Sequence, residues 1–242
     1  MADRWFVSIT VDTHDPLPVR TENQGAVGVD LGVSALATLS TGEIVPGPKA
    51  HTALLARLRR LSRGFSRKQL KSRNREKARR KLARLHARIA NIRVDALHKL
   101  TTDLARRFPL IGIEDLNVKG MMRNHHLARS IADMSFHEFR RQLEYKVAAR
   151  SGQVVVADRW YPSSKMCSVC HGYTEDLTLS TRQWTCSRCG SKHDRDVNAA
   201  INLKNLAVSS TVSACGEEGA GGDFMTAVKP ASKKQEISLK SA

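Results

Sequence analysis

The pattern of apolar and polar positions divides the first half of the chain into short strands and one long helical insertion. Residues 4–12 alternate apolar and polar side chains, which predicts a half-buried strand, and residues 13–26 are typical of a linker. Residues 27–47 predict two or three strands, with a tight turn at Thr41–Gly42. Leucines and isoleucines at three- and four-residue spacing over residues 54–108 then predict a long helical hairpin.

The second half of the chain begins with another buried strand. This apolar strand ends at Glu114, and residues 118–134 are expected to form a flexible loop. A helix should follow, with Ser135 as its N-cap and Glu138 completing a capping box. Residues 154–158 (VVVAD) predict one more buried strand, which precedes the cysteine-containing segment.

Four cysteines in two C-x-x-C pairs predict one zinc site. The pairs stand fifteen residues apart, a spacing at which two tight turns bring four thiolates around one tetrahedral ion. The loop between them is too short and polar to bury a core without the metal. Two disulfides in a secreted protein are the alternative, which the lack of a signal-peptide pattern disfavours. The predicted ligands are Cys167, Cys170, Cys186 and Cys189, whereas Cys215 is interpreted as a free thiol.

Two segments carry carboxylates at positions where the negative charge has to be stabilised by a partner. Asp30 interrupts a strand of apolar residues and glycines, so its buried charge requires either backbone N–H donors or a cation. We favour a metal ligand, with Gly28 and Gly32 leaving room for a phosphate or metal to approach the backbone. After the fourth cysteine, a predicted helix holds Asp194 and Asp196 in its first turn. Asp194 is expected to cap this helix or to complement its dipole.

The charge balance indicates a polyanionic partner. The 242 residues include 40 Lys and Arg against 23 Asp and Glu, so the formal charge is +17 and the pI is about 10.2. Phosphate contacts would dominate the affinity of such a chain, and nucleic acid is the expected partner. No apolar run approaches the roughly twenty residues that cross a bilayer, and we expect a cytoplasmic, nucleoid-associated protein with no membrane partner.

The basic residues are densest in the predicted helical hairpin. Thirteen of them lie between residues 57 and 81 with a single acid, Glu76, and like charges at this density oppose helix formation unless a polyanion neutralises them. The alternative is a solvated helical face. The residues expected to contact nucleic acid are Arg57, Arg59, Arg60, Arg63, Arg67, Lys68, Lys71, Arg73, Arg75, Lys77, Arg79, Arg80 and Lys81.

The order of the predicted elements is typical of a ribonuclease-H-like α/β domain. In such a domain a central strand would carry Asp30, a neighbouring strand Glu114 and a late helix Asp196, so that three acids far apart in sequence meet. Carboxylates are preferred ligands of hard divalent cations, and a pair of Mg²⁺ ions can activate a water and stabilise the leaving oxygen at a phosphodiester. The sequence therefore predicts a site for two magnesium ions.

Four motifs in this order resemble the TnpB (OrfB) family of insertion-sequence proteins, which are relatives of type V CRISPR effectors. The motifs are GVDLG at 28–32, GIEDLNVKGM at 112–121, YPSSKMCSVCH at 161–171 with WTCSRCG at 184–190, and HDRDVNAAINL at 193–203. The resemblance implies a RuvC nuclease domain with Asp30, Glu114 and Asp196 as catalytic acids, and a zinc-bearing target-nucleic-acid-binding module. It also implies RNA-guided cleavage of DNA, with a guide RNA and a target DNA as partners. In the family pattern D-R-D-x-N the second aspartate is the metal ligand, which selects Asp196 over Asp194.

The same resemblance implies a nuclease domain with two insertions. Family members carry an amino-terminal wedge barrel with a helical insert that grips the guide RNA, and the chain resembles the portion that follows it, with residues 4–12 as the last barrel strand. The expected units are residues 1–19 (residual strand and linker), 20–160 (first part of the nuclease domain, with the helical insertion at 50–107), 161–193 (zinc module), 194–208 (last nuclease helix) and 209–242 (disordered tail).

Two functions compete on this evidence. The first is a Mg²⁺-dependent DNA endonuclease of the TnpB type, which the presence of all three acids favours. The second is a DNA- or RNA-binding zinc protein that derives from such a nuclease and no longer cleaves. A DNA-strand transferase has little support, because no Tyr or Ser nucleophile occurs in a recognisable setting.

Overall fold

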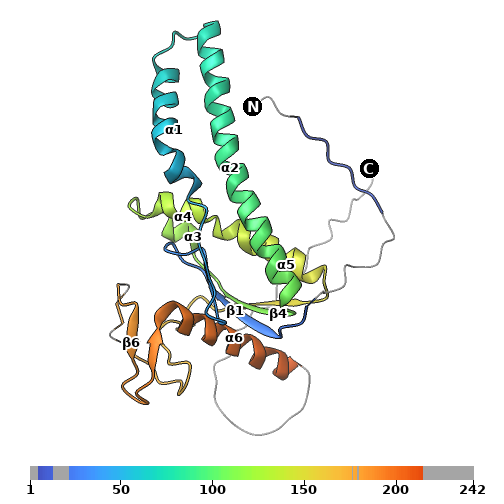
Figure 1. The fold of residues 1–242 in the computed structure, drawn as a ribbon, viewed down its shortest axis with the longest axis vertical. Helices are drawn as coiled ribbons and strands as arrows, with labels where there is room; N and C mark the ends of the chain where they lie inside the picture. Colours follow the sequence, from blue (N-terminus) through green and yellow to red (C-terminus); the bar gives the residue numbers. More distant parts are fainter. Residues whose placement is uncertain (1–4, 13–21, 176, 179, 215–242) are drawn as a thin grey trace, which may run out of the picture.

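A five-stranded mixed sheet forms the centre of the fold (Figure 1). The computed structural model describes residues 5–12, 22–175, 177–178 and 180–214. The strands follow the order β3-β2-β1-β4-β5, with β1 antiparallel to β2 and parallel to β4. The strands are β1 (Ala26–Asp30), β2 (Ala37–Leu39), β3 (Ile44–Val45), β4 (Leu110–Glu114) and β5 (Gln153–Ala157). The strands predicted within 27–47 and 154–158 are therefore confirmed.

One face of the sheet is covered by the helix α6 (Arg195–Ala214), which runs directly over β1 and β4. The close approach requires glycine, because a Cβ on Gly28 would overlap the carbonyl of Ala200 and one on Gly112 would overlap that of Leu203. The expectation that Gly28 leaves room for a phosphate or metal is therefore wrong. The helix backbone fills that space.

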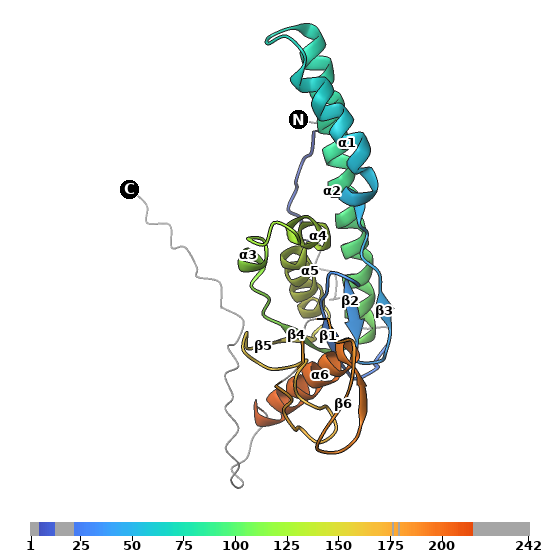
Figure 2. The same cartoon turned by 90° about the vertical axis from the view of Figure 1, so that its left-hand side faces the viewer.

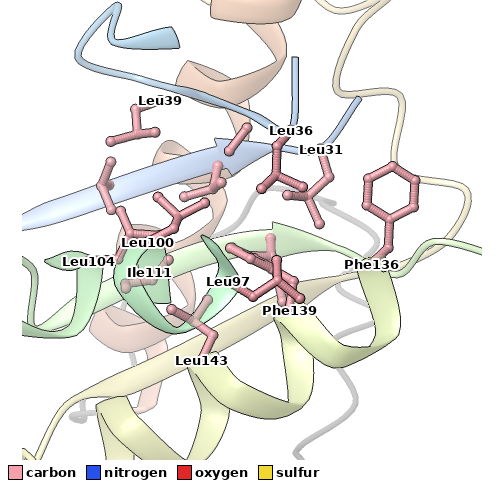
Figure 3. Packing of buried hydrophobic residues seen from close by; sticks show 14 of the residues in the cluster. Leu31, Leu36, Leu39, Leu97, Leu100, Leu104, Ile111, Phe136, Phe139 and Leu143 are labelled. Atoms are coloured by element: carbon pink, nitrogen blue, oxygen red, sulfur yellow. The ribbon is translucent and has the colours of Figure 1, made fainter. Parts of the chain in front are cut away.

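The main hydrophobic core lies on the opposite face, between the sheet and two helices (Figure 3). These helices are α5 (Phe136–Ala148) and the inner half of α2 (Arg73–Arg107). Leu104 of α2 and Phe139 of α5 are fully buried against Ile111 of β4. Burying side chains of this size contributes roughly 1.5–3 kcal/mol each, so this layer fixes β1 and β4 in place.

The predicted helical hairpin is confirmed as α1 (Ala50–Ser66) and α2, which rise together from the sheet (Figure 2). Its own small core contains Leu58, Leu85 and Ile89. Ser72 caps α2 by accepting a hydrogen bond from the Arg75 backbone N–H at 3.1 Å. Because the outer half of α2 packs against α1 and the inner half against the sheet, this single helix connects the hairpin to the core.

A buried carboxylate, Asp133, fixes the root of the hairpin. It is 1% exposed and accepts hydrogen bonds from the first backbone N–H groups of α1, at His51 (3.0 Å) and Thr52 (3.2 Å). Arg93 of α2 pairs with the same carboxylate at 2.9 and 2.6 Å. One side chain of α4 (Ala128–Met134) therefore caps one hairpin helix and holds the other.

Residues 118–134 do not form the flexible loop that was predicted. They contain α3 (Val118–Met121) and α4, which is held by the burial of Ile131 and Met134. The predicted capping box at α5 is also wrong. Ser135 has a left-handed backbone (φ 55°) because it closes α4 as well as opening α5, and its hydroxyl donates to Ala132 O at 3.1 Å. Glu138 pairs with Arg141 instead.

The two ends of the chain correct two further expectations. Residues 5–12 form no strand, and Trp5, Phe6 and Ile9 are exposed, because no edge of the described sheet pairs with this segment. Disorder was expected from residue 209, yet α6 continues to Ala214. The remainder of the expected tail (215–242), Cys215 and most of the expected linker lie outside the described residues.

Candidate active site and metal centre

Two of the three predicted acids end neighbouring parallel strands. Asp30 is the last residue of β1 and Glu114 the last residue of β4. Their preceding residues, Val29 and Ile113, are partners in the parallel ladder, so both acids emerge at the same edge of the sheet. Asp196 lies in the first turn of α6, which packs on the same two strands.

Burial and neighbouring charges change the pKa values of these acids. Burial raises the pKa of Asp30 well above its usual value, and repulsion from Glu114 and Asp196 raises it further, while Arg195 and Arg182 oppose the shift. Burial also raises the pKa of Glu114, against a hydrogen bond from Ser163 and the attraction of Arg195. Like charges held together in a partly dry setting disfavour ionisation, and a bound cation would relieve that repulsion.

Two polar residues that the sequence did not single out contact these acids. Arg182 lies 3.3 Å from each oxygen of Asp196 and 3.2 Å from the Ser34 hydroxyl. Ser163 donates a short hydrogen bond to Glu114. Ser163 could have been suspected from its place in the PSSK motif, whereas nothing near Arg182 in the sequence signals its long-range contact.

Asp194 has the structural role that was predicted for it. Its carboxylate accepts hydrogen bonds from the backbone N–H groups of Asp196 and Val197, both at 3.1 Å, and so caps α6. Asp196 makes no such cap, and its carboxylate faces Arg182 instead. The two acids of the first turn therefore have different roles, and only Asp196 acts on the charge of Asp30.

The four predicted cysteines come together in a group that could hold a metal ion. Their sulfur atoms all lie within 4.8 Å of one another, and the Cys167–Cys189 and Cys170–Cys186 pairs are each separated by 3.6 Å. A tetrahedron of thiolates around one ion, with ligand distances of about 2.3 Å, has edges near 3.8 Å, so the donor set fits a Cys₄ metal site. Hydrogen bonding with Ser191 lowers the pKa of Cys189 to about 6. Against a backbone hydrogen bond at Gly172, burial and the three neighbouring thiols raise the pKa of Cys170 to about 12, so a bound cation is needed to keep all four sulfurs as thiolates.

A small hairpin supports the cysteine group. It consists of β6 (Gln183–Thr185) and β7 (Lys192–Asp194), in which Trp184 and His193 are cross-strand partners with ring centroids 4.7 Å apart. His193 Nε2 lies 3.1 Å from Cys167 Sγ, a contact that can orient a ligating sulfur. Because β7 leads directly into α6, the cysteine group and Asp196 share one continuous stretch of backbone.

Two buried asparagines attach the cysteine module to α6, and the sequence analysis did not identify them. Asn198 donates to Met166 O at 2.8 Å, and Asn202 donates to Ser163 O at 2.7 Å and to Met166 O at 2.6 Å. Asn198 also accepts from the Ser168 backbone N–H at 2.9 Å. Both side chains are almost completely buried, so this connection between the module and α6 is rigid.

The thirteen basic residues of the hairpin are arranged mainly on its surface. Arg75 is the partly buried one, and its guanidinium holds the hairpin turn through the carbonyls of Phe65 and Lys68. Arg79 and Arg80 pair with Glu76. The other ten form no ion pair or side-chain hydrogen bond within the described part of the chain: Arg57, Arg59, Arg60, Arg63, Arg67, Lys68, Lys71, Arg73, Lys77 and Lys81. They are available to an external polyanion.

Among the helices that the structure describes, none combines the length and apolar character needed to cross a bilayer.

Comparisons of sequence with known families match two regions of the chain. Residues 8–125 match the family OrfB_IS605, described as a probable transposase, and residues 136–203 match the Cas12f1-like TNB domain. A protein of Streptomyces pristinaespiralis named "Putative RNA-guided DNA endonuclease" is 49% identical over 217 residues, which cover 89% of this chain and 52% of that protein. InsQ of Escherichia coli K12, which carries the same description, is 38% identical over 88% of this chain and 56% of its own length. The chain thus spans about half the length of these curated relatives.

The fold is similar to that of solved Cas12f structures. A Cas12f1 chain from a complex with sgRNA and target DNA aligns with a TM-score of 0.52 at 16% identity, covering 74% of this chain and 38% of that one. A chain from a CRISPR-Cas12f ternary complex aligns with a TM-score of 0.56, also at 16% identity, over 78% of this chain and 41% of that one. At this identity the likeness concerns the mixed α/β fold.

Proposed function

Because this chain belongs to the OrfB (TnpB) family of insertion-sequence proteins, we propose that it is the nuclease portion of an RNA-guided, Mg²⁺-dependent DNA endonuclease. One observation carries the proposal, which is that Asp30 and Glu114 end neighbouring parallel strands at one edge of the sheet, with Asp196 in the first turn of the helix that packs on both strands. Burial and these two neighbouring acids raise the pKa of Asp30. Strongly perturbed carboxyl groups of this kind are typical of sites that bind catalytic cations.

We assign the central sheet to the ribonuclease-H-like (RuvC) class. The assignment is supported by the strand order, in which β1 lies in the middle and carries Asp30, and β4 beside it carries Glu114. The late helix α6 contributes Asp196. In this reading α1 and α2 form one insertion and the cysteine module forms another, with the limits given by the sequence (50–107 and 161–193).

The proposed roles follow from the contacts of each side chain. Asp30, Glu114 and Asp196 would hold two Mg²⁺ ions, which when bound supply an activated water and a stabilised leaving oxygen at a phosphodiester. Ser163 orients Glu114 through its hydrogen bond. Arg182 neutralises Asp196 in the structure, and this ion pair has to open when Asp196 becomes a metal ligand.

The four cysteines are proposed to hold one structural zinc ion. The sulfur geometry fits the ion, and thiolate ligands select zinc over magnesium. Metal analysis of protein purified without chelator should find about one zinc per chain, and Cys186→Ser should lose the metal and unfold the module. A zinc content below about half an ion per chain would overturn the assignment.

The partners are proposed to be a guide RNA and a target DNA. Ten exposed cations on the hairpin that pair with no side chain among the described residues support a phosphate-binding surface there. Guided cleavage also needs a channel that holds the RNA and opens the duplex, as in related effectors. We expect residues 1–242 alone to bind nucleic acid and to show weak or no programmable cleavage.

Cleavage assays with residues 1–242 test the nuclease assignment. In Mg²⁺, the chain should nick single-stranded DNA, and Asp30→Ala should lower the rate by at least about 100-fold without changing affinity more than about twofold. Asp95→Ala, at an exposed acid on α2 outside the proposed triad, serves as the control and should leave the rate within about twofold.

Two results would contradict the proposal. If Asp30→Ala cleaves as fast as the wild type, the acids are not catalytic. The cleavage then comes from a contaminating nuclease, and the chain is a nucleic-acid-binding protein that does not cleave. If matched plasmid is cut efficiently and mismatched plasmid is spared when only this chain and its RNA are present, no further protein segment is needed for guidance.

A further inference from the structure

Trp160 is displayed to solvent on the loop that leaves the active-site edge of the sheet. The residue is 85% exposed. Its loop follows β5, whose last residue, Ala157, pairs with Glu114 in the parallel ladder. A large indole normally packs at least one face against the protein, so an exposed one at this edge requires an explanation.

Trp160 is not exposed because its loop lacks contacts, since hydrogen bonds fix the backbone on both sides of it. The Trp160 backbone N–H donates to the Asp158 carboxylate at 2.9 Å, and the Tyr161 N–H donates to the Asp158 carbonyl at 3.0 Å. The Tyr161 hydroxyl donates to Asn202 O of α6 at 3.3 Å, and Ser163 reaches Glu114. The indole is therefore carried on a fixed backbone.

The loop combines this aromatic side chain with positive charge. Arg159, the preceding residue, lies 3.1 Å from Asp115 and keeps about half of its side chain exposed. Lys165 follows five residues later and sits over the Tyr173 ring at 5.9 Å. An exposed aromatic face on a loop that also carries basic residues fits an unpaired nucleobase and its phosphate, because every base offers a π-face for stacking. A base within a duplex is already stacked and does not fit.

We propose that Trp160 stacks on one unpaired base of the strand that enters the carboxylate site. The inference rests on the proposed function and deepens it by naming a side chain that would position the single strand. Trp160 is then a positioning residue, because a base held on a fixed loop sets which phosphodiester lies beside Asp30 and Glu114. It takes no part in the chemical step.

The test compares Trp160→Ala with Trp5→Ala, a matched control at an equally exposed tryptophan (87%) outside the sheet. Binding is measured by anisotropy without Mg²⁺, so that cleavage does not contribute. Three probes of equal length are used: oligo-dT, an abasic deoxyribose-phosphate strand, and a duplex. Trp160→Ala should weaken oligo-dT binding by roughly 5- to 100-fold and change the other two by less than about twofold. Trp5→Ala should change none of them.

Tryptophan emission gives a second and independent result. Stacking on a base should quench the emission of the wild type when oligo-dT binds, Trp160→Phe should remove that quenching, and Trp5→Phe should retain it. An equal loss on all three probes, no loss on oligo-dT, or unchanged quenching in Trp160→Phe would overturn the inference. Failure of the wild type to bind any probe would overturn it together with the proposed nucleic-acid partner, whereas a lack of cleavage with normal stacking would count against the nuclease assignment alone.

Discussion

At the scale of single residues, Asp30 illustrates how a proposed catalytic site opposes stability. Burial and the neighbouring acids raise its pKa in the folded protein above the usual value, so the folded state binds this proton more tightly than the unfolded state. Stability therefore falls as the pH rises from the unfolded pKa, near 4, through the raised folded pKa. The full penalty is present above that window.

Asp30→Asn should accordingly stabilise the metal-free protein at neutral pH. Each 1 kcal/mol of repulsion removed should raise the melting temperature by roughly 2–4 °C, and the advantage should vanish near pH 4, where the wild-type carboxyl is itself protonated. Mg²⁺ should raise the melting temperature of the wild type and leave that of Asp30→Asn unchanged. Asp95→Asn, at an exposed acid on α2, is the control and should change little. A variant less stable than the wild type at pH 7 would contradict this account of the site.

At the scale of elements, the hairpin depends on the single carboxylate at its root. Asp133→Ala removes the cap of α1 and leaves Arg93, whose side chain is only a fifth exposed, without its partner. We expect a loss of about 3–5 kcal/mol in the free energy of unfolding. Hydrogen exchange should show that amides in 50–66 lose protection before those of β1 and β4.

Asp103→Ala is the matched control for this prediction. Asp103 lies on the same helix and pairs with Arg107 at 2.9 Å, but it is half exposed and should contribute less than about 1 kcal/mol. Uniform loss of protection across the hairpin and the sheet in Asp133→Ala would show that the carboxylate stabilises the whole domain and has no special relation to the hairpin.

The elements also show what a sequence can and cannot predict. Buried strands that end in Asp30 and Glu114 and the long periodic helices were predicted correctly, because burial leaves a local pattern of side chains. The strand at 4–12 failed because alternation indicates a strand only when a sheet edge is present to pair with it. The capping box at Ser135 failed because this residue joins two helices and its backbone is set by both.

The acids and cysteines of the candidate site were predicted from the sequence, whereas the residues that contact them were not. The cysteines were predicted because their spacing is local, Asp30 and Glu114 because each lies in or at the end of an apolar strand, and Asp196 because of the family resemblance. Arg182, Asn198 and Asn202 act across the boundary between the cysteine module and the sheet, and a contact of this kind leaves no periodic trace in the sequence. Only the folded chain reveals them.

At the scale of the whole molecule, the charge of +17 predicts a steep dependence of nucleic-acid affinity on salt. Each phosphate contact on single-stranded DNA should contribute about −0.7 to the slope of log K against log salt. Replacing Arg57, Arg60 and Arg63 with Ala together should therefore reduce the slope by up to about 2. Titration of anisotropy between roughly 50 and 200 mM salt measures it.

Arg141→Ala provides the comparison for this measurement. Arg141 is exposed on α5, outside the basic stretch at residues 57–81, and is already paired with Glu138 at 2.7 Å. Its loss should leave the slope unchanged. If the triple variant on α1 has the same slope as the wild type, the hairpin is a solvated face, and the phosphate contacts lie elsewhere on the molecule.

The attachment of α2 gives the molecule a mechanical property. From Arg93, where Asp133 holds the helix, roughly twenty residues lead to the start of α2 at Arg73, a length of about 30 Å at 1.5 Å per residue. A tilt of about 10° at that fulcrum would move the tip by about 5 Å, more than the 3.4 Å between successive nucleotides along a strand. For any bend of α2 at Arg93, the tip of the hairpin therefore moves much farther than its root.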